Sequence, residues 1–300
     1  MELSQLAAEL RRLIRGEVRR KEPLHKHTSF RIGGPAEVLV LPRDEESLRR
    51  VVVHAHTSGS PLYVLGGGTN VLVPDDGLNG VVIRTTRCLK ALRIEGESVI
   101  AGAGIALPRL AALTVEAGLS GLEFACGIPG TLGGGLVGNA GAHGRSLADV
   151  VTDVWGLDPE GREIHLTHRE CGFGYRRSTL GGALLITCAR LALSPGDRDK
   201  GREMMEAYLR WRRSHQPLGF PSAGSVFRNP PEGPSAGALI DRAGLKGYRL
   251  GGAQISELHA NFIVNRGGAT AQDVLSLIAL AQREVKKQFG VTLELELTVL

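Results

Sequence analysis

Hydrophobic residues at the start of the chain recur every three or four positions, the spacing of one face of an α-helix. The residues in this pattern are Leu3, Leu6, Ala7, Leu10, Leu13 and Ile14. A second helical pattern begins after Asp44, a preferred capping residue, and ends near Gly59. A third has Pro108 near its first turn and Gly118 just past its end, where these residues usually flank a helix.

Between residues 61 and 193 the hydrophobic residues come mostly in short runs separated by turns. The runs are PLYVL, VVIR, ALRIE, SVIAG, VVTDVWGL, REIHLT and ALLITCARLAL. Short strands around one clear helix predict an α+β domain rather than a doubly wound parallel sheet. The next stretch, SPGDRDKG from Ser194 to Gly201, has the composition of a linker.

The C-terminal part of the chain predicts a further α+β unit. It contains the helical stretch REMMEAYLRWRRS, a proline-rich loop and the strand HANFIVN. Thr270 and Asp273 have the spacing of a capping box, at the start of a helix that Gly290 ends. The final stretch VTLELELTVL alternates strictly, so it predicts a strand with its leucines on one face.

Composition and charge narrow the class of protein. The 300 residues are 42% hydrophobic and 22% charged, ordinary values for a soluble chain of two or three subdomains. The net charge is +5, but no block of Lys and Arg of the kind that binds nucleic acid occurs and aromatic residues make up only 4%, which argues against nucleic-acid binding. No segment reads as a signal peptide or membrane span, so we expect a cytoplasmic protein without membrane insertion.

The cysteines and histidines predict neither a disulfide framework nor a metal site. The four cysteines are widely spaced and form no CxxC pair, so we expect small buried thiols in a reducing compartment. They are Cys88, Cys126, Cys171 and Cys188. The two HxH pairs, at residues 25–27 and 54–56, lack a third ligand at suitable spacing, so no metal is predicted.

The chain contains 41 glycines, and three glycine-rich stretches suggest a binding site. In YVLGGGTNVLV a strand ends in Gly66–Gly68, followed by Thr69 and Asn70, and successive N–H groups in such a turn suit a pyrophosphate. In GLEFACGIPGTLGGGLVGNAG bare backbone surrounds Thr131, and Asn139 offers an amide for the edge of a ring. Together with AGAGIAL, these stretches fit one long dinucleotide lying across the domain. The alternative is three unrelated turns.

The second stretch also matches the GxGxxG pattern of Rossmann folds through Gly133, Gly135 and Gly138. The context is wrong for that fold, because CGIPGT and not a strand precedes the match. Gly138 and Gly141 are moreover expected to prevent the helix that should follow.

Seven segments, in this order, resemble the UDP-N-acetylenolpyruvoylglucosamine reductase (MurB) family of peptidoglycan synthesis and cover nearly the whole chain. They are HTSFRIGGPA, YVLGGGTNVLV, EFACGIPGTLGGGLVGNAGA, CGFGYRRS, PSAGSVFRNP, LIDRAGLKGYRLGGAQISELHANFIVN and LELEL. The glycine stretches alone are shared by flavoproteins of the vanillyl-alcohol-oxidase type, whereas YRRS, AGSVF and LELE are specific to the family.

The resemblance implies an α+β fold with an FAD-binding domain of the vanillyl-alcohol-oxidase type. This domain would have two subdomains, residues 1–60 and 61–195, followed by an α+β substrate-binding domain, residues 196–300. It also implies non-covalent FAD, NADPH as hydride source and an enolpyruvyl ether of UDP-N-acetylglucosamine as oxidant. The product would be UDP-N-acetylmuramate. The oligomeric state is left open, with a monomer favoured.

Three catalytic residues carry over from the family motifs. Arg176 would pair with the substrate carboxylate, since a guanidinium binds carboxylates bidentately. Ser225 would donate a proton to the strongly basic carbon left by hydride transfer. Glu296 must not repel the developing anion, so it would be either protonated or bound to a cation. Without the resemblance, the sequence would indicate only a surface arginine at Arg176, a turn serine at Ser225 and a solvated glutamate at Glu296.

Further site residues follow from the same motifs. Cofactor contacts are expected from Tyr63, Leu65, Gly66, Gly67, Gly68, Thr69, Asn70, Gly102, Gly104, Gly127, Pro129, Gly130, Thr131, Gly133, Gly134, Asn139 and Gly141. Substrate contacts are expected from Tyr175, Arg213, Asn229 and Lys246. One branch of the family carries an insertion whose tyrosine covers the substrate, and this chain resembles the shorter branch without it.

Two rival functions remain from the sequence. One is another flavin-dependent oxidoreductase of the same superfamily that acts on a different small molecule. The other is a non-catalytic nucleotide-binding module that uses its basic charge for partner contact.

Overall fold

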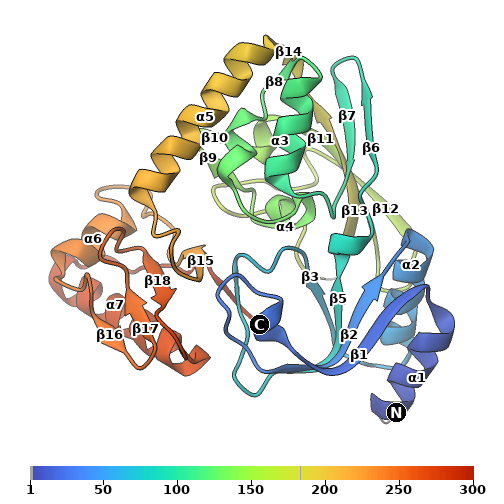
Figure 1. The fold of residues 1–300 in the computed structure, drawn as a ribbon, viewed down its shortest axis with the longest axis horizontal. Coiled ribbons are helices and arrows are strands. Elements are labelled where there is room, and N and C mark those ends of the chain that lie inside the picture. Colours follow the sequence, from blue (N-terminus) through green and yellow to red (C-terminus); the bar gives the residue numbers. More distant parts are fainter. Residues whose placement is uncertain (1–2, 183) are drawn as a thin grey trace. The chain divides into compact units, whose positions relative to one another are not determined.

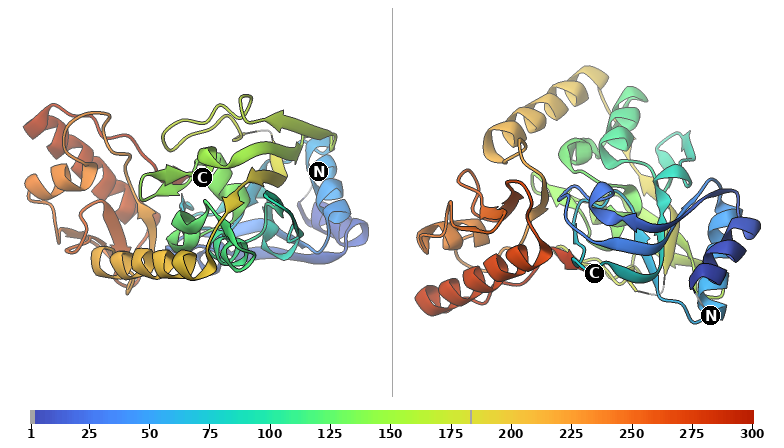
Figure 2. Two further views of the ribbon diagram at one scale, coloured as in Figure 1. Left: turned by 90° about the horizontal axis from the view of Figure 1, so that it is seen from above. Right: turned by 60° about the horizontal axis from the view of Figure 1, so that its bottom comes forward.

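The computed structural model describes residues 3–182 and 184–300, which form two compact units (Figures 1 and 2). Unit 1 consists of Met1–Glu22, Ala36–Gly67 and Asn79–Arg210. Unit 2 consists of Pro23–Pro35, Gly68–Leu78 and Trp211–Leu300. Each unit is therefore assembled from segments that are far apart in the sequence.

The first sheet of unit 1 has four strands in the order β1-β2-β5-β3. They are β1 (Gly16–Pro23), β2 (Pro35–Pro42), β5 (Leu78–Arg84) and β3 (Leu62–Leu65), accompanied by helices α1 (Leu3–Leu13) and α2 (Glu45–Thr57). Leu10 of α1, Val51 of α2 and Ile83 of β5 are buried in one core cluster. As predicted, α2 begins after Asp44, whose carboxylate accepts a hydrogen bond from Ser47 N at 2.7 Å.

The second sheet of unit 1 has five antiparallel strands in the order β12-β11-β13-β7-β6. They are β12 (Glu163–Thr167), β11 (Val151–Leu157), β13 (Leu185–Ala192), β7 (Ser98–Gly102) and β6 (Leu92–Glu95). Helices α3 (Leu107–Glu116) and α4 (Leu132–Val137) pack into its core. Two short antiparallel pairs complete the unit, β8 (Leu119–Ser120) with β14 (Ser194–Pro195) and β9 (Gly141–Ala142) with β10 (Arg145–Ser146).

Unit 2 is built on a four-stranded antiparallel sheet in the order β15-β18-β17-β16. Its strands are β15 (Ser222–Ser225), β18 (Phe262–Asn265), β17 (Ala253–Ile255) and β16 (Arg249–Leu250), and its helices are α6 (Ala236–Arg242) and α7 (Ala271–Phe289). The predicted capping box of α7 is confirmed, because the side chains of Thr270 and Asp273 each accept a hydrogen bond from the other's backbone N–H at 3.0 Å. Gly290, at φ +72°, ends this helix as predicted.

The C-terminal stretch is not the long strand that its alternation predicts. Only Thr298–Val299 forms a strand, β19, which pairs in parallel with β4 (Val71–Leu72). Just before it, the N–H groups of Glu296 and Leu297 both donate to Val226 O. In a regular ladder, consecutive N–H groups point to opposite sides, so this double contact interrupts the strand.

One further sequence prediction is wrong. The expected linker Ser194–Gly201 contains the start of helix α5 (Arg198–His215), because Asp197 Oδ1 accepts hydrogen bonds from the first free N–H groups, those of Asp199 and Lys200. Gly138 and Gly141, by contrast, act as expected, because α4 ends with Gly138 as its C-cap and the next element is strand β9.

The cysteines behave largely as the sequence predicts. Cys88, Cys126 and Cys171 are buried, while Cys188 is half-buried. Burial raises the pKa of Cys88 and of Cys171 to about 11, so both thiols are protonated at neutral pH.

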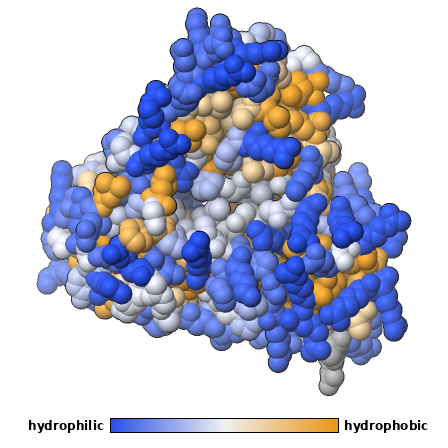
Figure 3. Space-filling view, in the orientation of Figure 1, coloured by the Kyte–Doolittle hydropathy of each residue, from blue (hydrophilic) through white to orange (hydrophobic). Residues whose placement is uncertain are grey.

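The surface over α5 is largely hydrophilic (Figure 3). None of the helices in the described part of the chain is long and apolar enough to cross a membrane. Within residues 3–182 and 184–300, no three His, Cys, Asp or Glu side chains are grouped so that they could hold a metal ion.

Candidate active site

In unit 1 the glycine-rich stretches lie side by side. A Cβ added at Gly66 would lie 2.4 Å from Thr131 Oγ1, so the first two stretches are in contact. Thr131 also forms a β-bridge with Ala106, and Leu107 N donates to Gly130 O at 3.0 Å. The prediction that these three parts of the sequence share one place is therefore confirmed for their unit 1 residues.

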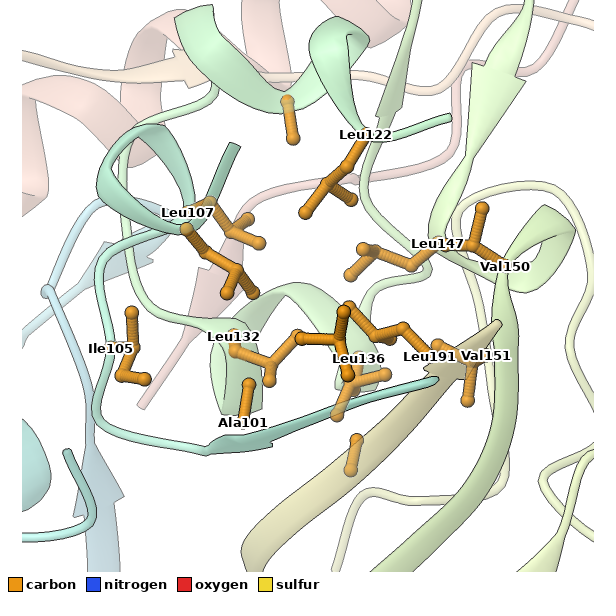
Figure 4. Close-up of a cluster of buried hydrophobic side chains, with 14 of the residues drawn as sticks. Ala101, Ile105, Leu107, Leu122, Leu132, Leu136, Leu147, Val150, Val151 and Leu191 are labelled. Carbon is orange, nitrogen blue, oxygen red and sulfur yellow. The ribbon is translucent and has the colours of Figure 1, made fainter. Parts of the chain in front are cut away.

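Helix α4 is held with one face toward the core. Thr131 caps it by accepting a hydrogen bond from Gly134 N at 3.4 Å. Leu132 and Leu136 point into the cluster that also contains Leu107 (Figure 4). The glycines of this helix therefore divide into an inner and an outer set.

The inner glycines are explained by packing. A Cβ at Gly135 would lie 2.8 Å from a methyl carbon of Leu107, and one at Gly133 would lie 3.0 Å from the Cβ of Ala103. Close packing also explains three other glycines that were predicted to contact the cofactor. A Cβ added to any of them would lie within 2.4 Å of a backbone atom: Gly102, Gly104 and Gly141. The lack of a side chain at these positions gives no support for a ligand.

Two outer glycines have no such explanation. At Gly134 an added Cβ would meet no atom closer than 3.7 Å, and at Gly138 none closer than 4.0 Å. Gly134 lies inside α4, where glycine costs about 0.5–1 kcal/mol relative to alanine, whereas Gly138 is the C-cap of this helix. These two positions, four residues apart, leave bare backbone on the outer side of α4. A ligand lying close to this backbone is a physical reason to keep them.

The other predicted cofactor residues differ in exposure. Tyr63, in β3, is half-buried, Leu65 is buried in the core, and Gly127 and Gly130 are half-buried, whereas Pro129 is exposed. Gly67, the last residue of its unit 1 segment, is half-buried.

Gly68, Thr69 and Asn70 belong to unit 2. Gly68 O accepts a hydrogen bond from Ser29 N at 2.9 Å, and its φ of +64° requires glycine. Asn70 Nδ2 donates to Glu296 O at 2.9 Å. The amide expected to contact a cofactor thus fixes the backbone of a predicted catalytic residue.

Arg176 occupies a tight turn of unit 1. Gly174 N donates to Arg177 O at 3.0 Å and Arg177 N donates to Gly174 O at 3.3 Å, which places Tyr175 and Arg176 at the tip. Arg176 has a left-handed φ of +53°, and its guanidinium carbon lies 5.7 Å from the centre of the Tyr175 ring. The Tyr175 side chain is exposed.

Asn139 does not present its amide as the sequence suggests. It is only 6% exposed, and its Nδ2 donates to Gly174 O at 2.9 Å while its Oδ1 accepts from Ala148 N at 3.0 Å. The amide is therefore engaged within unit 1, at the base of the turn that carries Arg176.

Ser225 and Glu296 are brought together in unit 2, although 71 positions separate them in the sequence. Ser225 ends β15, opposite Phe262, and Glu296 N donates to Val226 O at 2.9 Å. Both side chains are half-buried. Two of the three predicted catalytic residues thus meet at Val226, which follows Ser225 in the chain and accepts the hydrogen bond of Glu296 N.

The backbone after Ser225 is held by Asn261, which the sequence does not single out. Asn261 Oδ1 accepts from Phe227 N at 2.9 Å and its Nδ2 donates to Phe227 O at 2.8 Å. The side chain is 4% exposed. A buried amide that pairs with both groups of one residue fixes the local backbone.

A cavity of about 350 Å³ lies in unit 2 and is lined in part by Arg213. Phe220 and Arg266 also line it, with the Arg266 guanidinium 4.1 Å from the centre of the Phe220 ring. Neither residue was predicted, although the proline-rich loop that contains Phe220 was. The sequence gives no signal for them, because single aromatic or basic residues in loops form no recognisable motif.

The remaining predicted substrate residues are engaged elsewhere in unit 2. Asn229 Oδ1 accepts a hydrogen bond from Ala236 N at 3.1 Å, at the start of α6. Lys246 Nζ forms an ion pair with Asp241 Oδ2 at 2.8 Å. Among the described residues, neither is part of the cavity lining.

Comparison with known proteins identifies the family. Residues 216–300 match the family model for the UDP-N-acetylenolpyruvoylglucosamine reductase C-terminal domain, and residues 36–167 match that for an FAD binding domain. UDP-N-acetylenolpyruvoylglucosamine reductase 2 of Symbiobacterium thermophilum is 48% identical over 303 residues, covering 99% of this chain and 97% of the relative. The chain belongs to the UDP-N-acetylenolpyruvoylglucosamine reductase family.

Solved structures agree with membership of this reductase family. UDP-N-acetylenolpyruvylglucosamine reductase (MurB) from Thermus caldophilus is 38% identical, with a TM-score of 0.80 over 95% of this chain and 99% of its own. Alkyldihydroxyacetonephosphate synthase, 19% identical, shares the fold over 64% of this chain and 44% of its own, with a TM-score of 0.50. The predicted α+β fold, with an FAD-binding domain of the vanillyl-alcohol-oxidase type and a C-terminal domain, is confirmed.

Proposed function

We propose that this protein reduces the enolpyruvyl ether of UDP-N-acetylglucosamine to UDP-N-acetylmuramate, an oxidoreductase step of peptidoglycan precursor synthesis. Membership of the reductase family supports the reaction. The observation that carries the proposal for this chain is the link between Ser225 and Glu296 through Val226. When bound, FAD would supply the redox chemistry, which is the transfer of a hydride from NADPH to the enolpyruvyl group.

The residues of unit 1 fit a flavin dinucleotide held without a covalent bond. The open backbone at Gly134 and Gly138 is a cradle that a Cβ would fill. Gly66, Gly67 and Thr131 would hold the cofactor beside it, since backbone N–H groups of glycine turns bind anions such as a pyrophosphate.

Arg176 would orient the carboxylate of the substrate. A guanidinium keeps its charge and donates two parallel hydrogen bonds to a carboxylate, so it also stabilises the negative charge that develops next to that group. The turn formed by Gly174–Arg177 would fix its direction. Tyr175, exposed at the same tip, would pack against the substrate.

Ser225 would donate its Oγ proton to the neighbouring carbon of the enolpyruvyl group. A hydroxyl can act as the acid here because the carbon that receives the proton is far more basic than a typical enzyme base. Glu296 would be protonated or bound to a cation, so that no unpaired negative charge faces the developing anion.

The cavity of unit 2 would receive the nucleotide part of the substrate. Its volume is within the usual range for a small-molecule site. Arg213 would supply positive charge for the diphosphate, and Asn229 and Lys246 remain predicted substrate contacts. The functional boundaries that we propose are FAD-binding subdomains at 1–60 and 61–195 and a substrate domain at 196–300.

The proposal includes a cytoplasmic location and a monomer. Protonated, buried thiols such as those of Cys88 and Cys171 agree with a reducing compartment. Analytical ultracentrifugation at micromolar concentration tests the monomer, and a sedimentation coefficient that rises with concentration would contradict it.

The proton-donor role of Ser225 is tested with anaerobic half-reactions. In Ser225→Ala we expect reduction of the bound flavin by NADPH within about twofold of wild type. Reoxidation by UDP-N-acetylglucosamine enolpyruvate should be slower by about 10²–10⁴, the usual contribution of a positioned acid. Ser222→Ala, on the same strand, is the control and should leave both rates unchanged. Equal slowing of both half-reactions in Ser225→Ala would refute the role.

A further inference from the structure

The turn that carries Arg176 is tied to the end of helix α4 by two side chains. Asn139 Nδ2 donates to Gly174 O at 2.9 Å, and Ser178 Oγ donates to Val137 O at 2.8 Å. The base of the turn thus depends on the segment that ends α4.

Asn139 is suited to hold this position rather than to bind a ligand. Its φ is +42°, a left-handed conformation that asparagine tolerates better than most residues. Its amide oxygen accepts from Ala148 N at 3.0 Å, which fixes the orientation of the amide and directs the NH₂ group to Gly174. At 6% exposure the side chain is shielded from water, so each bond would be costly to lose.

We propose that Asn139 is a positioning residue that acts through Arg176, by anchoring the turn that aims the guanidinium. The inference rests on the proposed role of Arg176 in substrate reduction. It replaces the expected contact between the Asn139 amide and the edge of the flavin ring. A displacement of about 1 Å in such a group can lower a rate about 10²-fold.

Two substitutions of Asn139 distinguish the loss of its hydrogen bond to Gly174 O from a general loss of folding. Asn139→Asp keeps the acceptor for Ala148 N but loses the donor to Gly174 O. Asn139→Gly removes the whole side chain while accepting the left-handed φ without strain. Each should slow reoxidation by UDP-N-acetylglucosamine enolpyruvate about 10–100-fold and leave flavin content and reduction by NADPH within twofold of wild type. Loss of flavin, equal slowing of both half-reactions, or unchanged reoxidation would overturn the proposal.

A double-mutant cycle tests whether Asn139 acts through Arg176. If it does, Asn139→Gly combined with Arg176→Ala should reoxidise within about twofold of Arg176→Ala alone. If the double variant were instead slowed by the product of the two single-variant factors, the positioning role of Asn139 would be overturned. A normal rate in Arg176→Ala alone would instead sink the proposed role of Arg176, so the two failures are distinguishable.

Hydrogen exchange gives a readout that does not depend on turnover. In protein stripped of flavin, Asn139→Gly should speed amide exchange at least tenfold in a peptide covering residues 172–180. A peptide from the second sheet, residues 185–192, is the control and should not change. If residues 172–180 of Asn139→Gly exchanged at the wild-type rate, the proposal that Asn139 anchors this turn would be overturned.

Discussion

Two residues of the proposed arginine clamp have strained backbone. Asn139 and Arg176 have left-handed φ angles of +42° and +53°. Such conformations cost a non-glycine residue of order 1–3 kcal/mol and persist where the surrounding contacts impose them. At Arg176 those contacts are the reciprocal hydrogen bonds of Gly174 and Arg177. A strained turn that fixes one side chain suits a residue that must orient a carboxylate.

Replacing Arg176 with lysine tests the clamp. Arg176→Lys keeps the charge but loses the planar fork, so we expect kcat/KM for the UDP-enolpyruvyl sugar to fall by about 10²–10³. Arg177→Lys changes the neighbouring arginine of the same turn and should stay within about threefold of wild type. Near-normal turnover by Arg176→Lys would contradict the bidentate contact.

Replacing Gly134, on the outer side of α4, tests the proposed cofactor cradle. We expect the stability of the flavin-free protein to rise and its affinity for FAD to fall. Gly134→Ala should raise the free energy of unfolding of the flavin-free protein by about 0.4–1 kcal/mol, because an open helical position gains from alanine. The same methyl group should weaken FAD binding at least tenfold, as measured by flavin fluorescence on titration.

Gly135→Ala is the matched control for Gly134→Ala. Its methyl group would collide with the side chain of Leu107, so the flavin-free protein should be destabilised. An FAD affinity unchanged by Gly134→Ala would show that the bare face of α4 is not the cradle.

At the scale of elements, the sequence predicts most where the signal is local. The caps of α2 and α7 follow from a few adjacent residues, and both are confirmed. The final strand and the onset of α5 were predicted wrongly for a common reason. Each is decided by hydrogen bonds that composition and alternation do not encode, those of Val226 O and of Asp197 Oδ1.

The second sheet of unit 1 carries a charged network that should stabilise the fold in a pH-dependent way. Asp153 accepts hydrogen bonds from His165 Nε2 at 2.7 Å, Thr152 Oγ1 at 2.9 Å and Arg190 Nη1 at 3.2 Å. Burial opposes ionisation of Asp153, but these partners outweigh it and lower its pKa. The folded protein therefore holds this proton less tightly than the unfolded chain.

We expect Asp153→Asn to lower the free energy of unfolding by about 1 kcal/mol at pH 7. Because the folded-state pKa is lowered, the stabilisation is present above the ordinary aspartate pKa of about 4 and is lost as pH falls through the folded-state value. Urea unfolding at pH 7 and pH 3 measures this. A difference between variant and wild type that is as large at pH 3 would refute the ionic contribution.

At the scale of the molecule, the motifs predict the family and the glycine-rich stretches but not the contacts that assemble the site. Gly66 meets Thr131, and Val226 meets Glu296, across some 65–70 positions. No spacing rule links residues so far apart, because the intervening chain sets their approach. For the same reason Asn261 and Arg266 escaped prediction, and the amide of Asn139 was assigned to a ligand rather than to Gly174.

The reaction itself is tested most directly in a single turnover. Purified protein, yellow from bound flavin, is bleached anaerobically with one equivalent of NADPH and then mixed with UDP-N-acetylglucosamine enolpyruvate. We expect that the yellow colour returns within seconds and that mass spectrometry finds one UDP-N-acetylmuramate per flavin. Protein that stays bleached after mixing, or regains colour without forming that product, would contradict the proposed function.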